Sequence, residues 1–246
     1  RSAPDGYTIG MGHTGTQAIN PHIYAKLAYD PLKDFSPITP LVSYVNVLVV
    51  NPQVPARTVA ELVDYAKANP GKVTFASGGI GATNHLSGEL LKAITGAPMV
   101  HVPYKGSAPA LVDVMSGNVT MMFDILVTSL PQLKNGKVRA LAITSDKRSE
   151  YAPDIPTMRE SGVPGYAAAG SDLWFGVFAP ANTPRAIVER LNAELVKAMD
   201  SAEVKERMRA QAYSRWTLRP DAFSEFLRTD HEKWGKVVRS AGIKAE

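Results

Sequence analysis

The segment Ser77–Thr83, with the sequence Ser-Gly-Gly-Ile-Gly-Ala-Thr, has the residue types best suited to binding a ligand. It connects a predicted strand at 73–76 to a predicted helix at 83–95, so its backbone N–H groups stand at the positive end of a helix dipole. The hydroxyls of Ser77 and Thr83 add further donors. These features predict an anion site, for example for a carboxylate. A tight turn with Thr83 as the helix N-cap is the alternative.

A second glycine-rich stretch, Gly10–Gly15, formally matches the dinucleotide fingerprint G-x-G-x-x-G. That motif needs a helix opening at its glycines, whereas here only Thr16–Asn20 precedes Pro21. A flexible turn after a strand is the preferred interpretation, with His13 and Thr14 as candidates to line a cleft. Nucleoside triphosphates are disfavoured as well, because the chain lacks the G-x-x-x-x-G-K-[ST] pattern.

No constellation of catalytic residues emerges from the sequence. There is no G-x-S-x-G elbow, and the five histidines show no metal-ligand spacing. The absence of cysteine excludes disulfides and thiolate metal sites. We therefore expect no catalysis, no metal and no cofactor. His85 is interpreted as a capping or core residue, and Asp124, at the end of an apolar strand, as either a helix N-cap or a cleft residue.

The composition is that of a globular protein: 246 residues, 45% hydrophobic and 20% charged. No run reaches the roughly 18 apolar residues that span a bilayer, so any signal peptide is expected to have been removed or never to have existed. The net charge of +4 is mildly basic. The densest basic stretch, 205–209, is diluted by an acid and lies in a helical pattern, which favours a solvated helix face over nucleic-acid binding.

Strands and helices alternate through the middle of the chain. Apolar runs predict strands at 45–51, 73–76, 99–102, 119–123 and 138–144, with helices at 58–69, 83–95, 107–116 and around 129–135. This alternation predicts a parallel, mostly buried sheet with helices on both faces. Ligands bind such sheets at the loops that follow the strands.

The two ends of the chain are predicted to form a lobe together. Three long helices after residue 182 need a sheet to cover, and the early strands at 7–12 and 35–43 are the natural candidates. We therefore expect an α/β protein with a first lobe of 1–48 plus 176–246 and a second lobe of 49–175, joined by two crossing segments.

Several motifs are distinctive in combination: Ala3–Thr8, Asn20–Tyr24, Leu48–Asn51, Ser77–Leu86, His101–Gly106 with Pro109-Ala110, and Phe175–Pro180 before Thr183-Pro184. Together they resemble the substrate-binding receptors of tripartite tricarboxylate transporters, the Bug family. The resemblance covers essentially the whole chain. It implies a type II periplasmic-binding-protein fold whose lobes close on a small di- or tricarboxylate without catalysis.

The resemblance also implies a monomeric periplasmic receptor that delivers its ligand to membrane transporter subunits. It maps the ligand site onto His13, Thr14, Tyr44, Ser77, Gly78, Gly81, Ala82, Thr83, Asp124 and Trp174. The assignments of Asp124 and Trp174 rest mainly on the resemblance, and packing of Trp174 within a strand is the alternative.

Two departures from the family pattern stand out. Family members usually begin with a further strand and helix carrying a Pro-Gly-Gly loop, and this chain is expected to start after that element. Ala82 stands where the family often has serine, which removes a hydroxyl but keeps the backbone N–H. Two other functions remain open: a ligand-sensing regulatory domain of the same fold, and a nucleotide-dependent oxidoreductase using Gly10–Gly15.

Overall fold

The computed structural model describes residues 2–166, 173–240 and 242–243, which fall into two compact units. The terminal unit takes the described residues of Arg1–Tyr44 and Leu173–Val238, and the middle unit takes those of Val45–Asp172 and Arg239–Ile243. The first change of unit lies just before β3 (Asn46–Val50) and the second just before β8 (Leu173–Pro180). The whole of β8 therefore belongs to the terminal unit.

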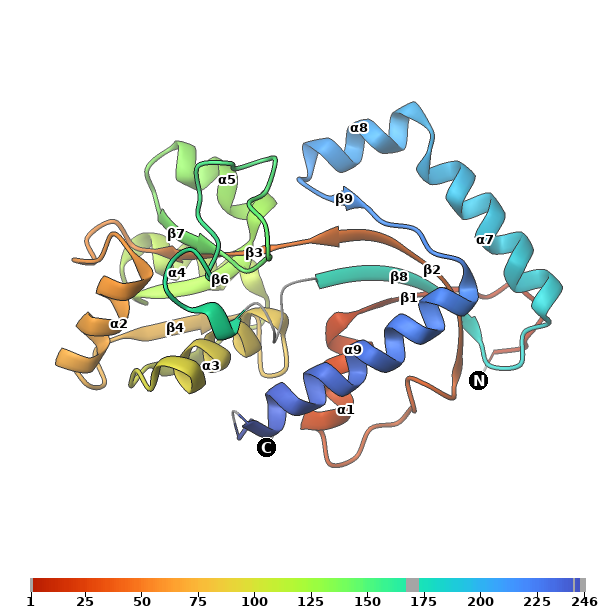
Figure 1. Cartoon of the computed structure of the whole chain (residues 1–246), viewed down its shortest axis with the longest axis horizontal. Helices are drawn as coiled ribbons and strands as arrows, with labels where there is room; N and C mark the ends of the chain where they lie inside the picture. The colour runs from red at the N-terminus through yellow and green to blue at the C-terminus, as the bar shows by residue number, and fades with distance from the viewer. Residues whose placement is uncertain (1, 167–172, 241, 244–246) are drawn as a thin grey trace. The chain divides into compact units, whose positions relative to one another are not determined.

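The terminal unit is built on a four-stranded sheet in the order β1-β8-β2-β9 (Figure 1). Its other strands are β1 (Gly10–His13), β2 (Phe35–Tyr44) and β9 (Ser214–Arg215). All of its pairings are antiparallel. The register of β2 shifts after Pro37 and again after Pro40, where proline has no N–H to give to a ladder.

Three helices cover the two faces of this sheet: α7 (Arg185–Met199), α8 (Ala202–Ala210) and α9 (Pro220–Ser240). Because side chains alternate along a strand, Val177 of β8 packs towards Val188 of α7 while Trp174 and Phe178 pack against Phe223 of α9. Ile38 of β2 lies in the same apolar cluster as Val177 and Val188, so β2 also packs beneath α7.

The segment after β1 is helical, which corrects the expected flexible turn. A π-helical turn, η1 (Gly15–Ile19), leads directly into the short helix α1 (Asn20–Ile23). Pro21 lies in the first turn of α1, where its missing N–H costs no helical hydrogen bond. Ala18 and Ile19 are fully buried, so packing stabilises a segment too short to show a helical period.

The middle unit contains a five-stranded sheet in the order β5-β4-β6-β3-β7. The strands are β4 (Thr74–Ser77), β5 (Val100–Pro103), β6 (Met121–Ile125) and β7 (Arg139–Ile143), together with β3. β4 runs parallel to β5 and β6, but β3 is antiparallel to both β6 and β7. The prediction of a parallel sheet is therefore wrong for β3. Its fully apolar pattern identifies a buried central strand but carries no information on direction.

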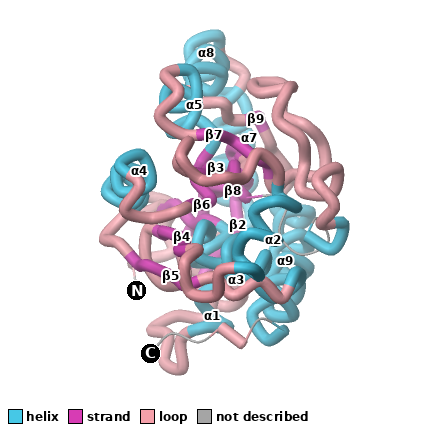
Figure 2. Tube along the Cα trace, turned by 90° about the vertical axis from the view of Figure 1, so that its left-hand side faces the viewer, coloured by secondary structure: helices cyan, strands magenta, loops and turns pink. Residues whose placement is uncertain are grey.

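Helices pack on both faces of this sheet, and Figure 2 shows α4 on one side with α2 and α3 on the other. They are α2 (Val59–Ala68), α3 (Thr83–Thr95), α4 (Ser107–Ser116) and α5 (Leu126–Lys134). Thr58 caps α2 by accepting the N–H of Glu61, as the capping-box spacing predicts. Gly88 lets α3 approach β4, because a Cβ there would lie 2.4 Å from the ring of Phe75.

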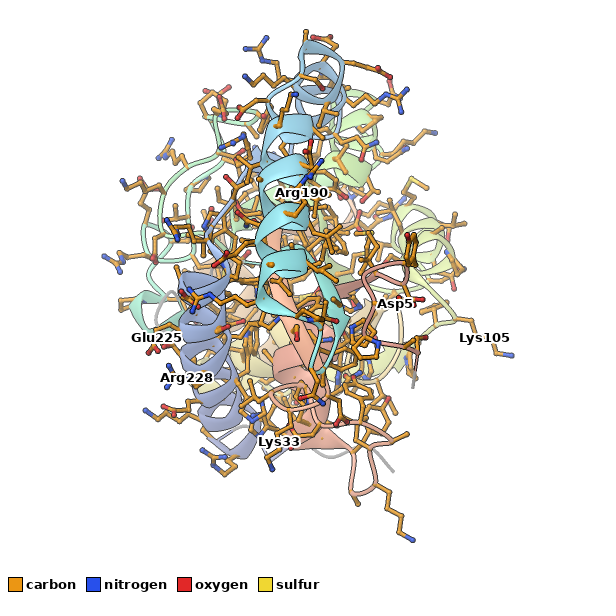
Figure 3. All side chains as sticks on the ribbon, turned by 90° about the vertical axis from the view of Figure 1, so that its right-hand side faces the viewer. Asp5, Lys33, Lys105, Arg190, Glu225 and Arg228 are labelled. Carbon is orange, nitrogen blue, oxygen red and sulfur yellow. The ribbon has the colours of Figure 1, made fainter. Side chains whose placement is uncertain are left out.

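Charged side chains on the terminal unit lie on outer helix faces. Figure 3 shows Arg190 on α7 and Glu225 and Arg228 on α9. Arg190 pairs with Glu194 four residues on, and Glu225 pairs with Arg228. Arg207, in the basic stretch of α8, is 76% exposed and pairs with Glu203. These are solvated, mutually compensated faces. Among the described residues, no helix has the length and hydropathy required to cross a membrane.

Candidate functional site

Buried polar side chains gather at one edge of the middle unit's sheet. The parallel register places Phe75 beside Met121 and Ala76 beside Met122, so Ser77 of β4 and Asp124 of β6 reach the same edge. Asn46, the first residue of the antiparallel strand β3, starts there as well, opposite Ile125. The sheet thus brings together two predicted site residues that lie far apart in the sequence.

The glycine loop, defined as Ser77–Thr83, needs its glycines for backbone geometry. Gly79 has a φ of 130° and Gly81 a φ of 82°, which are unfavourable for residues with a side chain. At Gly78 a side chain would be crowded, because its Cβ would lie 3.1 Å from both the backbone nitrogen and the hydroxyl of Ser107.

Four backbone N–H groups of the glycine loop are occupied within the protein. Gly78 donates to Asn84 Oδ1 at 3.1 Å and Gly79 to Ser77 Oγ at 3.2 Å. Gly81 donates to His85 Nδ1 at 3.2 Å, and Ala82 donates to the carbonyl of Gly79 at 3.2 Å. The loop is therefore internally braced, and most of its N–H groups are not available to a ligand in this conformation.

The open donors lie at the start of α3. Ala82 is the N-cap and makes no side-chain capping bond, so the alternative with Thr83 as N-cap is wrong. Within the described residues, the N–H groups of Thr83 and Asn84 have no acceptor. They are the first two residues of a 13-residue helix, where the dipole favours negative charge. This end of α3 can accept an anion.

Two neutral histidines lie beneath the glycine loop. His101 Nε2 is 2.6 Å from Ser77 Oγ, and the rings of His85 and His101 are 4.1 Å apart. Burial lowers the pKa of each to about 4, so neither carries charge at neutral pH. Because His85 Nδ1 accepts from Gly81, its hydrogen is on Nε2. The hydroxyl of Ser77 is already engaged by His101 and the backbone of Gly79.

Asp124 braces the first turn of α5. Its Oδ2 accepts hydrogen bonds from Ser129 at 2.8 Å and from Thr128, while Ile125 is the N-cap residue. The side chain is 1% exposed, and this burial raises the pKa of the carboxyl group. Oδ1 has no partner among the described residues. The residue acts in helix-end packing without being the N-cap itself.

The remaining predicted residues lie together in the terminal unit. His13 ends β1 opposite Phe175 of β8, and Tyr44 ends β2 opposite Leu173. The antiparallel pairings therefore place His13 and Tyr44 beside the start of β8. Thr14 is bound to the same part of β8, because its Oγ1 accepts the backbone N–H of Trp174 at 3.0 Å.

His13 offers a donor at this edge. Its Nδ1 accepts the N–H of Gly15 at 3.1 Å, so the neutral ring carries its hydrogen on Nε2. Burial lowers the pKa of His13, which favours that neutral form. Tyr44 stacks on Phe175 with ring centroids 4.9 Å apart.

The indole of Trp174 is completely buried in the core of the terminal unit. It packs with Phe178, Phe223 and Leu227, and its Nε1 donates to Asp230 Oδ2 at 2.9 Å. This matches the alternative in which the side chain packs within a strand. The contact of Trp174 with the predicted site residue Thr14 is made by its backbone N–H and not by its indole.

The strand pairing around Gly10–Gly15 does not support a dinucleotide site. The described strand that pairs with β1 is β8, and the pairing is antiparallel. The fingerprint requires a strand–helix–parallel-strand unit.

The sequence does not indicate Asn84 or His101 as site residues, and it favours a capping or core role for His85. The signal that the sequence carries is the run of polar side chains in the first turn after the glycine loop. The hydrogen-bond partners of these side chains depend on the folded conformation of the loop.

The α/β fold, with two sheets covered by helices, is that of the periplasmic binding proteins. Residues 1–243 match the tripartite tricarboxylate transporter family receptor, and the chain belongs to that family. The curated relatives include BugT of Bordetella pertussis, 35% identical over 245 residues that cover 99% of this chain and 74% of BugT. The UPF0065 protein in the tcbD-tcbE intergenic region of Pseudomonas sp. strain P51 is 35% identical, over 97% of this chain and 70% of that protein.

Solved structures support the same classification. Rpa4515 of R. palustris with adipate is 36% identical, with a TM-score of 0.90 over 99% of this chain and 81% of that one. MatC of Rhodopseudomonas palustris with bound malate is 32% identical, with a TM-score of 0.84 over 96% and 81%. The periplasmic binding protein BugD is 33% identical, with a TM-score of 0.87 over 100% and 82%. The predicted fold class is confirmed.

Proposed function

We propose that this protein binds a small dicarboxylate in the periplasm and delivers it to a membrane transporter. The observation that carries the proposal is the start of α3, where the N–H groups of Thr83 and Asn84 have no acceptor among the described residues. The family supports it, and two similar solved proteins hold adipate and malate, each with two carboxyl groups.

The chemistry of the site suits reversible binding. The glycine loop contains no charged side chain, so neutral N–H donors at a helix N-terminus would hold the carboxylate. Hydrogen bonds to a charged group are worth about 1.5–3 kcal/mol each. Two such bonds give useful affinity without a buried ion pair that must be broken on release.

Further ligand contacts are proposed for the terminal unit. His13 supplies an Nε2–H donor, and Thr14 and Tyr44 lie at the same sheet edge. We assign Ser77, Gly78, Gly81 and Ala82 to the loop that supports the contact, because their donors are used internally. We do not assign ligand contacts to the side chains of Asp124 and Trp174, since both are buried.

We infer binding without turnover, which is the activity expected of a receptor. The pair Ser77 and His101 resembles part of a nucleophile–base arrangement, but the serine is fully buried. The inference is tested by incubating the protein with adipate and malate and recovering both acids. Chemically altered product would contradict it.

Isothermal titration with adipate, malate and citrate tests ligand binding, and the neutral diamide of adipic acid serves as the control for charge. We expect at least one acid to bind and the diamide not to. Ligand at 100 times its dissociation constant should raise the free energy of unfolding by about 2.7 kcal/mol. If none of the acids binds, the carboxylate proposal is wrong. Delivery is tested separately, by acid uptake in cells with and without the receptor.

A further inference from the structure

We propose that Asn84 and His85 are positioning residues that hold the glycine loop in the conformation that presents the start of α3 to a carboxylate. The proposal rests on the proposed function. Neither side chain is assigned a contact with the ligand. Each acts through a backbone N–H of the loop, and both are almost fully buried, at 6% exposed.

Asn84 ties three segments together. Its Oδ1 accepts the N–H of Gly78 at 3.1 Å and that of His85 at 3.0 Å. Its Nδ2 donates to Ser107 Oγ at 3.1 Å, in the first residue of α4. Gly106 completes the connection by donating its N–H to the carbonyl of Gly78 at 3.1 Å. One amide side chain thus fixes the glycine loop against both α3 and α4.

His85 fixes the other end of the loop. Its Nδ1 accepts the N–H of Gly81 at 3.2 Å, immediately before the N-cap of α3. The ring cannot turn away freely, because it packs against His101 on one neighbouring strand and Phe75 on the other. The tautomer follows from this bond, since Nδ1 must be free of hydrogen to accept it.

These bonds have a consequence for affinity. The N–H groups of Gly78 and Gly81 are satisfied inside the protein, so a carboxylate does not compete for them and meets the open donors of α3 instead. Without the two side chains, Gly78 and Gly81 would carry unpaired N–H groups and the loop would gain conformational freedom. Binding would then include the entropic cost of ordering it again.

The test compares adipate and malate affinity in four variants. Asn84→Ala and His85→Leu remove the acceptors, and we expect each to weaken binding about tenfold or more. His85→Asn places an acceptor near the position of Nδ1, and we expect it to restore most of the affinity. The matched control is Asn51→Ala. Asn51 is 5% exposed and also makes three hydrogen bonds, but at the end of β3 that lies away from the loop. It should lose stability and keep its affinity.

A second readout does not depend on ligand. Amide hydrogen exchange should accelerate at Gly81 in His85→Leu and at Gly78 in Asn84→Ala, and should stay slow at Gly81 in His85→Asn. If wild type binds no acid, the proposed function fails while this exchange pattern still decides whether the side chains hold the loop. Unchanged exchange in both acceptor-removing variants, or wild-type affinity in both, would overturn the positioning role.

Discussion

Gly81 shows how backbone geometry constrains the glycine loop. Its φ of 82° lies where a side chain strains the backbone, and its N–H is bound to His85 Nδ1. The residue is also buried. A substitution would therefore disturb the start of α3 through the backbone and not through loss of a side-chain contact.

We predict that Gly81→Ala lowers the free energy of unfolding by about 1–3 kcal/mol, the usual cost of holding a residue with a side chain in this region. Gly10→Ala is the control, because a Cβ there meets nothing within 4 Å and its φ is not positive. Urea denaturation of both variants checks the prediction. Equal stability of the two would mean that the loop has another conformation in solution.

The sequence identifies the glycine loop correctly as a feature next to a helix N-terminus, because glycine spacing and strand–helix order are local signals. It does not identify which N–H groups remain open. That depends on side chains such as Asn84, which bonds to Gly78 and to Ser107, 23 residues further on. Hydrogen bonds that join separate loops are set by tertiary packing and leave no periodic pattern in the sequence.

At the scale of elements, helix boundaries are predicted well. Thr58, at the start of α2, and the left-handed C-cap glycines Gly96 and Gly117 each act within one turn of the helix end they define.

Strand partners, in contrast, are predicted poorly. β3 lies between β6 and β7, both far later in the chain, and β8 lies between β1 and β2. An apolar run shows that a strand is buried, but its neighbours are chosen by long-range contacts.

A buried polar contact joins α9 to β8 beside the apolar cluster of Trp174, Phe178 and Phe223. Asp230 is 1% exposed, accepts the indole N–H of Trp174 at 2.9 Å and pairs with Lys233 at 3.0 Å. We predict that Asp230→Ala lowers the free energy of unfolding by about 1–3 kcal/mol, because it leaves the indole N–H buried without an acceptor. Glu232→Ala, an exposed position on the same helix, should change stability little.

Intrinsic fluorescence checks the same contact, because Asp230→Ala changes the surroundings of Trp174 in the native state. This measurement does not depend on how sharp the unfolding transition is. A native emission spectrum identical to wild type, combined with unchanged urea stability, would show that the contact does not hold α9 in place.

At the scale of the whole molecule, the buried His85 and the half-buried His101 make stability depend on pH. Burial lowers the pKa of His85 and His101 to about 4, against 6.5 for the free side chain. The pKa of His13 is lowered in the same direction. Between pH 4 and 6.5 the unfolded chain therefore binds more protons than the native one, and stability must fall as the pH is lowered through this window. Above this pH window, the contribution of the histidines to the free energy of unfolding is constant.

We predict that the double variant His85→Asn, His101→Gln loses much of this pH dependence. Asparagine keeps an acceptor for Gly81 and glutamine keeps a partner for Ser77, but neither titrates.

Asp124 acts in the opposite sense: its pKa is raised above 3.8, so its contribution to stability declines as pH rises past that value. Because Asp124 is present in both proteins, the difference between their urea stabilities at pH 4.5 and 7.5 isolates the histidines. We expect wild type to lose more stability than the double variant on acidification. Parallel losses would show that His85 and His101 titrate normally in the native protein.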